Sequence, residues 1–402
     1  MEIPTDHIER PERPYAAALA WRFAFKRKHN VASVVCLLYN APERGYPLTY
    51  ARDGIPRIEI YADGQTMPSP TAIDFMPGEL VGDVTGALGL RKFLAARGHS
   101  LTVLSDQDGR ASKFDQALTE AEIVISQACW PAHLNAERIF NARKLRLVVT
   151  AGEGTEHIDL EAAARRGITV AEIIHSCTVS AAEYAVMLIL SLVHNAAPLL
   201  VPDSRQLQYI ADYAQRAYDL EGMRVGVLGA GRVGFAVLRR LRPFDVRLHY
   251  SDPQRLPLAM EDDLRLTYHQ NVSAMLPVCD VVSIHSTMRD GTARLFDTDM
   301  IGRMKRGAYL INTARHDICD PDAVSRALAT GRLAGYAADT LLLRDRPVRI
   351  AGSTLPAQAR YAAGVREILE CWFDGIPIRD DYVILNRGQL TGIGARSYAL
   401  NG

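Results

Sequence analysis

The segment 225–236 constrains the fold of this chain more than any other stretch. It reads Val-Gly-Val-Leu-Gly-Ala-Gly-Arg-Val-Gly-Phe-Ala, an apolar strand that runs directly into a Gly-x-Gly-x-x-Gly turn. An amphipathic helix over 232–241 follows, and a second strand over 246–251 ends at Asp252. In a βαβ unit such glycines allow a tight turn, the close approach of a pyrophosphate and the packing of helix against strand. The segment therefore predicts a dinucleotide-binding unit.

The residues after the turn indicate which dinucleotide binds. Asp252 lies 18 residues past the third glycine, where a carboxylate accepts hydrogen bonds from ribose hydroxyls and repels a 2′-phosphate. Pro253 and Gln254 follow instead of a pair of arginines, so NAD is predicted in preference to NADP. Arg255 is the nearby basic group that a 2′-phosphate could still use. The predicted cofactor contacts in the turn are Gly229, Gly231, Arg232, Val233 and Gly234.

Length and composition favour a two-domain globular protein. The chain has 402 residues, a length that exceeds what a single hydrophobic core usually accommodates. Hydrophobic residues make up 48% of it and charged residues 23%, as in globular proteins. Lys plus Arg and Asp plus Glu both number 46, so no net field indicates nucleic acid or an anionic membrane as partner. Six cysteines without a Cys-x-x-Cys pair are typical of reduced thiols. We predict a cytoplasmic protein without a metal site, preceded by a polar extension over residues 1–30 that lacks a signal-peptide pattern.

Strand and helix patterns alternate along nearly the whole chain. Before the glycine turn, strands are predicted over 32–38, 101–104, 123–126, 147–150 and 168–171, and helices over 84–96, 112–119, 136–142, 160–166 and 179–199. After it, strands are predicted over 281–285, 308–312 and 333–338, and a last helix over 357–373 has no clear strand behind it. This alternation predicts an α/β protein with two Rossmann-like domains. The NAD-binding domain, residues 178–350, is inserted into a substrate domain of residues 31–177 and 351–402.

Motifs outside the glycine turn make the chain similar to one family. They include Tyr-Pro-Leu-Thr-Tyr-Ala-Arg-Asp at 46–53, Asn-Thr-Ala-Arg at 312–315 and Gln-Ala-Arg-Tyr-Ala-Ala-Gly at 358–364, with shorter matches at 64–66, 71–75, 212–220, 236–240 and 305–309. From about residue 32 to 398, the chain resembles the NAD-dependent formate dehydrogenases, a branch of the D-2-hydroxyacid dehydrogenase superfamily. The resemblance implies NAD as cofactor, a homodimer, and hydride transfer between a small-molecule substrate and the nicotinamide in a cleft between the domains.

The resemblance also assigns site residues. Arg315 matches the family arginine that holds the substrate, and it ends a strand where a guanidinium can bind a carboxylate bidentately. Asp339 matches the aspartate that hydrogen-bonds the nicotinamide carboxamide. Further cofactor contacts are expected at His285, Thr287, Thr313 and Ala314.

The substrate side departs from the family pattern. Cys177 stands where the family has an asparagine that holds formate, and Glu153 replaces an apolar residue between two glycines. The glutamine–histidine pair of the family has no counterpart, because the segment 340–352 is shorter and carries Arg349 at the histidine position. These changes predict a substrate other than formate.

The replacements allow several interpretations. Glu153 could pair with Arg315 across the cleft, recognise a cationic or hydroxylated substrate, or act as a protonated acid–base group. Cys177 could be a nucleophile or a small packing residue. The histidines that could replace the missing one are His175, His285 and His316.

Three hypotheses for the whole chain follow. It is an NAD-dependent dehydrogenase with an altered substrate, or an enzyme that runs another reaction with NAD as a recycled or structural group, or a catalytically silent NAD-binding protein. Fold alone does not choose among them.

Overall fold

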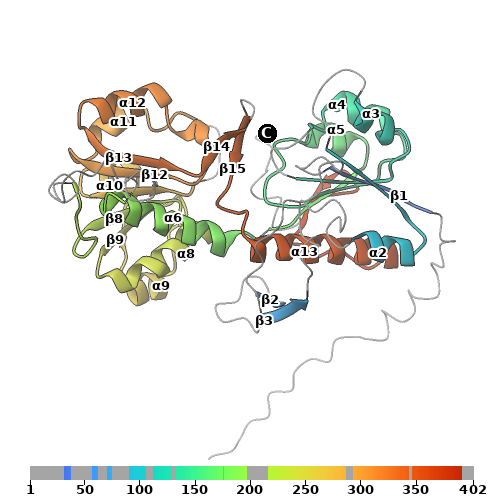
Figure 1. The fold of residues 1–402 in the computed structure, drawn as a ribbon, viewed down its shortest axis with the longest axis horizontal. Helices are drawn as coiled ribbons and strands as arrows, with labels where there is room; N and C mark the ends of the chain where they lie inside the picture. The colour runs from blue at the N-terminus through green and yellow to red at the C-terminus, as the bar shows by residue number, and fades with distance from the viewer. Residues whose placement is uncertain are drawn as a thin grey trace, which may run out of the picture.

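In a computed structural model, the protein folds around two large β-sheets that form two lobes (Figure 1). The structure describes residues 31–37, 57–61, 70–74, 90–105, 112–127, 132–174, 176–196, 216–286, 293–343 and 346–391. The predicted extension over residues 1–30 lies outside these ranges. No helix in the described ranges is both long enough and apolar enough to cross a bilayer.

The first lobe is built on a seven-stranded sheet of order β17-β16-β7-β6-β5-β1-β4. Its strands are β1 (Ser33–Leu37), β4 (Ser100–Leu104), β5 (Ile123–Ser126), β6 (Leu147–Thr150), β7 (Thr169–Glu172), β16 (Val383–Asn386) and β17 (Gln389–Leu390). One face packs against α2 (Leu90–Ala96) and α13 (Leu355–Asp374). The other packs against α3 (Lys113–Leu118), α4 (Ala136–Asn141) and α5 (Leu160–Arg165). Because both faces are covered, every residue of β5, β6 and β7 is buried.

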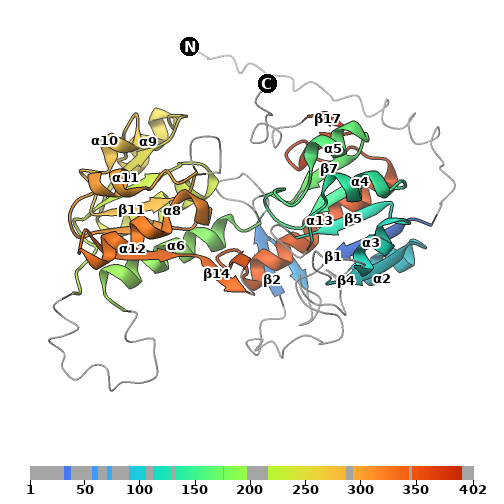
Figure 2. The ribbon, with the colours of Figure 1, turned by 90° about the horizontal axis from the view of Figure 1, so that it is seen from above.

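The second lobe holds a six-stranded parallel sheet of order β10-β9-β8-β11-β12-β13. Figure 2 shows this lobe from above, beside the first lobe. Its strands are β8 (Arg224–Leu228), β9 (Arg247–Ser251), β10 (Thr267–Tyr268), β11 (Val281–Ile284), β12 (Ala308–Asn312) and β13 (Leu333–Ala338). Its helices are α6 (Thr178–Val193), α8 (Arg232–Leu241), α9 (Leu258–Leu264), α10 (Val272–Met275), α11 (Thr298–Arg303) and α12 (Pro321–Ala329), with 3-10 turns η4 (Arg242–Phe244) and η5 (His316–Ile318). Helices α6 and α8 cover one face, and α10, α11 and α12 cover the other.

This arrangement confirms the predicted fold class, because the second sheet is inserted in the chain between β7 and β16 of the first. The sequence missed β16 and β17, two short strands behind α13: β16 pairs antiparallel with β7, and β17 pairs antiparallel with β16. It also missed two hairpins, β2 (Arg57–Tyr61) with β3 (Pro70–Asp74), and β14 (Thr340–Leu343) with β15 (Arg346–Arg349). Helix α6 ends at Val193 and not at 199, although residues 197–199 lie outside the described ranges.

The two chain crossings between the lobes are tied together where α6 and α13 begin. The Ser180 and Thr354 hydroxyls lie 2.7 Å apart, and Thr354 also caps α13. Arg360 of α13 donates from Nε to the carbonyl oxygen of Ser176, 2.5 Å away, just before α6. These contacts fix the start of both helices against each other and so set how the lobes meet.

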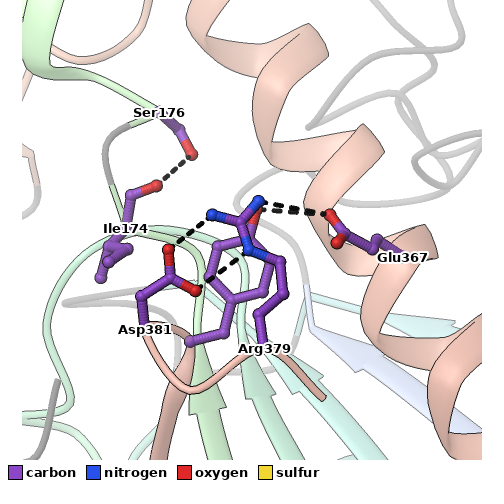
Figure 3. Close-up of polar contacts among 6 residues, drawn as sticks. Ile174, Ser176, Glu367, Arg379 and Asp381 are labelled. Carbon is purple, nitrogen blue, oxygen red and sulfur yellow. Dashed lines mark hydrogen bonds and ion pairs between the residues drawn. The ribbon is translucent and has the colours of Figure 1, made fainter. Parts of the chain in front are cut away.

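A second polar cluster anchors the other end of α13 to the first sheet (Figure 3). Arg379 donates from Nε to Asp381 at 3.0 Å, and its guanidinium also lies 3.9 Å from the Glu367 carboxylate on α13. The guanidinium carbon lies 4.5 Å from the centre of the Tyr382 ring. Burial raises the pKa of Glu367, and the Arg379 charge offsets part of that rise. The cluster therefore joins α13 to the segment that leads into β16.

Candidate active site

The glycine turn has the backbone geometry that the sequence predicts for a dinucleotide site. Gly229 has φ +86°, and a Cβ there would lie 2.9 Å from the carbonyl carbon of His285. A Cβ at Gly234 would lie 1.9 Å from the carbonyl oxygen of Gly229, so helix and strand meet too closely for a side chain. A Cβ at Gly231 would meet no described atom within 4 Å. That open space at the start of α8 fits a pyrophosphate, which would approach the helix N-terminus beside Arg232 and Val233.

The ribose end of the site is held in place by backbone hydrogen bonds. Asp252 accepts from the Ala230 amide at Oδ2 and from the Gln254 amide at Oδ1, both at 2.8 Å. Its carboxylate is thus fixed at the end of β9, beside the glycine turn. Arg255, the residue that a 2′-phosphate could have used, instead donates to Glu261 at 2.9 and 2.8 Å. This arrangement favours NAD over NADP.

The Arg255–Glu261 pair belongs to a tight network. Hydrogen bonds from Arg255 and from the Tyr250 hydroxyl lower the pKa of Glu261 to about 2. The Tyr250 hydroxyl in turn accepts a hydrogen bond from the Leu256 amide at 2.9 Å. The guanidinium of Arg255 also lies over the Tyr268 ring, 5.1 Å from its centre. Arg255 is therefore a structural residue of this lobe.

The edge where the sequence predicts the nicotinamide is organised by Asn312, the last residue of β12. Its side chain donates to the carbonyl oxygen of Arg315 at 2.9 Å and accepts from the Ala314 amide at 3.0 Å. The Thr313 hydroxyl lies 3.1 Å from Nδ1 of His285. This turn fixes the backbone that carries Arg315 at the carboxyl end of the sheet.

His285 and Asp339 are built into the same edge of the sheet. Nε2 of His285 lies 2.8 Å from the hydroxyl of Ser283 in β11, and Nδ1 contacts the Thr313 hydroxyl directly after β12, so both ring nitrogens make hydrogen bonds and the second one ties the end of β11 to that of β12. Asp339 follows β13 and is fully buried, with its backbone amide 3.3 Å from the Asn312 carbonyl. Both residues thus lie where the sequence places cofactor contacts. Thr287 lies outside the described residues.

The first lobe faces this edge with the loop 152–156. Gly152 and Gly154 have φ +153° and +108°, conformations that favour glycine. The Gly154 amide donates to Oε2 of Glu172 at 2.8 Å, and Glu172 is itself buried at the end of β7. The buried carboxylate of Glu172 thus fixes the position of the loop relative to the end of β7. Glu153 and Glu156 are thereby presented to the second lobe.

Two ion pairs join this loop to the second lobe, and their partners correct the sequence expectation. Arg315 pairs with Glu156 and not with Glu153. Glu153 instead lies 3.6 Å from the guanidinium of Arg232, the residue beside the predicted pyrophosphate position. Both carboxylates belong to one loop, so the docking of the lobes decides which arginine each one meets. A second acidic residue three positions after Glu153 was the signal that sequence reasoning left unused.

The Arg315–Glu156 pair has a measurable electrostatic signature. Partial burial between the lobes raises the pKa of Glu156, but the Arg315 charge and hydrogen bonds outweigh it, so the net pKa falls below the ordinary 4.5. The carboxyl therefore remains ionised and holds the guanidinium that would bind a substrate carboxylate. An anionic substrate has to compete with it.

Cys177 occupies the N-cap of α6 and is buried. A Cβ at Gly352 would lie 2.9 Å from the Cβ of Cys177 and 3.3 Å from the Tyr361 hydroxyl, so these three residues pack closely where the chain crosses between lobes. This environment is typical of a small packing residue.

Of the histidines considered as replacements, the structure describes His285 and His316. His316 is half-exposed, and its Nε2 lies 2.8 Å from Asp317. His175 and the side chain of Arg349 lie outside the described residues. The structure adds a histidine that the sequence did not single out, His157, directly after Glu156. It is buried, and its Nε2 lies 2.6 Å from the Ser126 hydroxyl. Burial is the main cause that lowers its pKa to about 4, so the ring is neutral at physiological pH.

A glycine turn that fits a dinucleotide, together with an arginine at the carboxyl end of the same parallel sheet that faces a second lobe, defines a two-domain NAD-dependent oxidoreductase. Comparisons with known proteins place it more closely. Residues 186–349 match the family model of the D-isomer specific 2-hydroxyacid dehydrogenase NAD-binding domain. A formate dehydrogenase of Pseudomonas sp. (strain 101) is 51% identical over 383 residues, covering 92% of this chain and 96% of that protein.

Solved structures agree with this assignment. A Granulicella formate dehydrogenase superposes with a TM-score of 0.82 at 51% identity, covering 90% of this chain and 100% of the other. The NAD-dependent formate dehydrogenase of Staphylococcus aureus, solved in complex with NAD, has a TM-score of 0.70 at 31% identity, with the same coverage. The chain therefore belongs to the NAD-dependent formate dehydrogenase family of the D-2-hydroxyacid dehydrogenase superfamily. It is an NAD-dependent oxidoreductase.

Proposed function

We propose that this oxidoreductase acts on a small hydroxylated substrate other than formate. The observation that carries the proposal is the loop 152–156, which brings two carboxylates to the second lobe and pairs one of them with Arg315. Formate has one negative group and no hydrogen-bond donor, so it would compete with Glu156 for Arg315 and be repelled by Glu153. A substrate with a hydroxyl group offers Glu153 a donor.

In this proposal the residues divide the work as follows. Residues 31–177 and 351–402 hold the substrate, and residues 178–350 hold NAD. NAD, when bound, supplies the hydride acceptor at its nicotinamide. Arg315 orients the substrate, and Glu153 accepts the hydroxyl proton as the carbon–hydrogen bond is broken and the carbonyl forms. Binding of NAD would draw Arg232 toward the pyrophosphate and weaken its pairing with Glu153. Cys177 packs at the crossing between the lobes and takes no part in the proton transfer.

A substrate panel tests the proposal. NADH formation would be followed with formate, small primary alcohols, 2-hydroxyacids and hydrated aldehydes as substrates. We expect turnover with one hydroxylated class and rates with formate lower by about 10²-fold or more. Glu153→Gln should abolish that turnover without loss of NAD binding, whereas Glu161→Gln, an exposed carboxylate on α5, should leave it unchanged.

Two outcomes would overturn the proposal. If formate is turned over as fast as any hydroxylated compound, the substrate is formate, as in the rest of the family. Tight NAD binding without turnover of any compound in the panel would favour the alternative, an NAD-binding homologue that is silent or runs another type of reaction.

We also propose that the enzyme works as a homodimer through α6. The exposed face of this helix carries Met187 and Val179, which are 47% and 38% exposed, and a shallow groove of about 430 Å³. The groove is mainly apolar, and its lining residues are Glu183, Val186, Met187, Leu190, Ser191, His194 and Ala196. Exposed apolar patches of this kind mark interaction surfaces. Light scattering should give twice the chain mass, and Met187→Glu should give the monomer, whereas Met260→Glu on α9 should not.

A cytoplasmic location is proposed from the cysteines. Cys36, Cys279 and Cys319 are buried free thiols, a state that a reducing compartment maintains. Fractionation of native cells should recover the protein with cytoplasmic markers, and recovery from an extracellular or organellar fraction would contradict this location.

A further inference from the structure

The second lobe has a basic groove at the edge of its sheet opposite the cofactor. Its volume is about 640 Å³, within the range of small-molecule sites. Arg224 begins β8 and Arg247 begins β9, and the glycine turn and Asp252 follow the opposite ends of these strands. Arg242 of η4 and Arg265, in the turn after α9, complete the basic wall. The groove is therefore separate from the active site.

The charge of this groove is unbalanced. Four arginines line it, and Asp245 is its one acidic residue. Among the residues that the structure describes, no carboxylate pairs with the side chains of Arg242, Arg247 or Arg265. The nearby Asp280 is already engaged, by Lys305 at 2.7 Å and by the Arg224 backbone amide at 2.8 Å. Guanidinium groups that line one groove without paired carboxylates repel one another, and an anion bound among them offsets that repulsion.

A histidine pair also lines the groove. Nδ1 of His249 lies 2.9 Å from Nε2 of His269, with the ring centres 5.2 Å apart. One ring must donate to the other, so the remaining ring nitrogens can turn to a ligand. Burial, the neighbouring ring and the positive charges of Arg224 and Lys305 lower the pKa of His249 to about 4, which Asp280 offsets in part. The pair is therefore neutral in the free protein and adds hydrogen-bonding groups without further charge.

We propose that this groove binds a small molecule bearing a chain of phosphate groups. Guanidinium forks match phosphate oxygens bidentately, and arginines that come from β8, η4, β9 and the turn after α9 can contact several phosphates at once. A single small anion would reach only part of this wall. The apolar floor, formed by Val246, Leu248 and Leu264, can also accept an organic group attached to the phosphates. The shared chemistry is a polyphosphate, free or carried by a nucleoside.

The proposal is tested by calorimetric titration of the NAD-saturated protein, in whichever oligomeric state it adopts. The two titrants are inorganic tripolyphosphate and, separately, ATP. Saturation with NAD fills the glycine turn, which would otherwise bind the same probes. We expect one tripolyphosphate per chain, with affinity that falls as salt is raised. Arg247→Glu and Arg265→Glu should each weaken binding by about tenfold or more. Arg303→Glu, an exposed arginine on α11 outside the groove, is the matched control and should leave it unchanged.

The outcomes distinguish a nucleotide ligand from a free phosphate chain, and each of them from a result that contradicts the proposal. Tighter binding of ATP than of tripolyphosphate supports a nucleotide ligand, and equal binding supports a free phosphate chain. No binding to the NAD-saturated protein overturns the proposal, as does equal weakening by all three charge reversals, which would indicate a general charge effect. Melting temperatures of the variants confirm that each is folded. None of these results depends on the substrate of the active site.

Discussion

Replacing Glu156 by glutamine should make Arg315 available to small anions. The structure pairs these two residues between the lobes, so the guanidinium is neutralised before any anion arrives. Glutamine keeps the size of the side chain and a hydrogen-bond acceptor but removes its charge. An anion that binds Arg315 would then no longer displace a carboxylate.

The magnitude follows from the exposure of the pair. The Arg315 side chain is 22% exposed and that of Glu156 is 47% exposed, so water screens the interaction in part. Unit charges about 4 Å apart interact by about 1 kcal/mol in water and by about 4 kcal/mol near a protein surface. Exposed pairs contribute less than 1 kcal/mol net. We therefore expect the Glu156→Gln variant to bind a small anion more tightly by about 1–2 kcal/mol, or about five- to thirtyfold.

The assay is calorimetric titration of the NAD-saturated protein with azide, nitrate and formate. Glu153→Gln is the matched control, because Glu153 lies on the same loop but pairs with Arg232. It should raise anion affinity less than Glu156→Gln does. Arg315→Gln should abolish the anion binding of either variant. A larger gain from Glu153→Gln than from Glu156→Gln would show that the pairing in solution is the one first expected from the sequence, and would refute the reasoning.

Three further predictions follow from the cofactor site and the buried imidazole. Asp252→Ala should weaken NAD binding and narrow the preference over NADP, because the carboxylate that repels a 2′-phosphate is lost; an unchanged ratio of the two dissociation constants would contradict this. Gly234→Ala should abolish NAD binding, since its Cβ would lie 1.9 Å from the Gly229 carbonyl oxygen, whereas Gly302→Ala, with no described atom within 4 Å, should bind NAD normally in the same titration. The pKa of His157 is about 4 in the folded protein and 6.5 in the unfolded chain, so the unfolded chain takes up the proton at a higher pH. The free energy of unfolding should therefore fall by up to about 3 kcal/mol as the pH drops from about 6.5 to 4. Urea unfolding across this range should show a smaller loss for His157→Gln.

The cofactor half of the site could be predicted from the sequence because it is local in the chain. The glycine turn, α8 and Asp252 lie within one βαβ unit, so their spacing alone places them around a pyrophosphate and a ribose. The same holds for the strands buried on both faces, which are continuous apolar runs bounded by polar turns. Predicted strands such as β5, β6 and β12 accordingly match the structure residue for residue.

The elements that the sequence missed depend on partners far along the chain. Strands β16 and β17 are short, and their residues alone do not predict that β16 will pair with the distant strand β7 and extend the sheet. The Arg315–Glu156 pair joins residues that are 159 positions apart in the chain. Neither pairing is written in a local pattern.

The sequence by itself determined that this protein is an α/β oxidoreductase that binds NAD, and that its substrate side departs from its family. Only the tertiary structure decided which charges meet there. Glu153 and Glu156 lie on one loop of the first lobe, and Arg232 and Arg315 lie at two strand ends of the second. The sequence does not decide which acid pairs with which arginine, because the attraction between opposite charges depends on their distance in space and not on their positions in the chain. The contacts between the starts of α6 and α13 hold the two lobes in one relative position, and that position decides which acid meets which arginine.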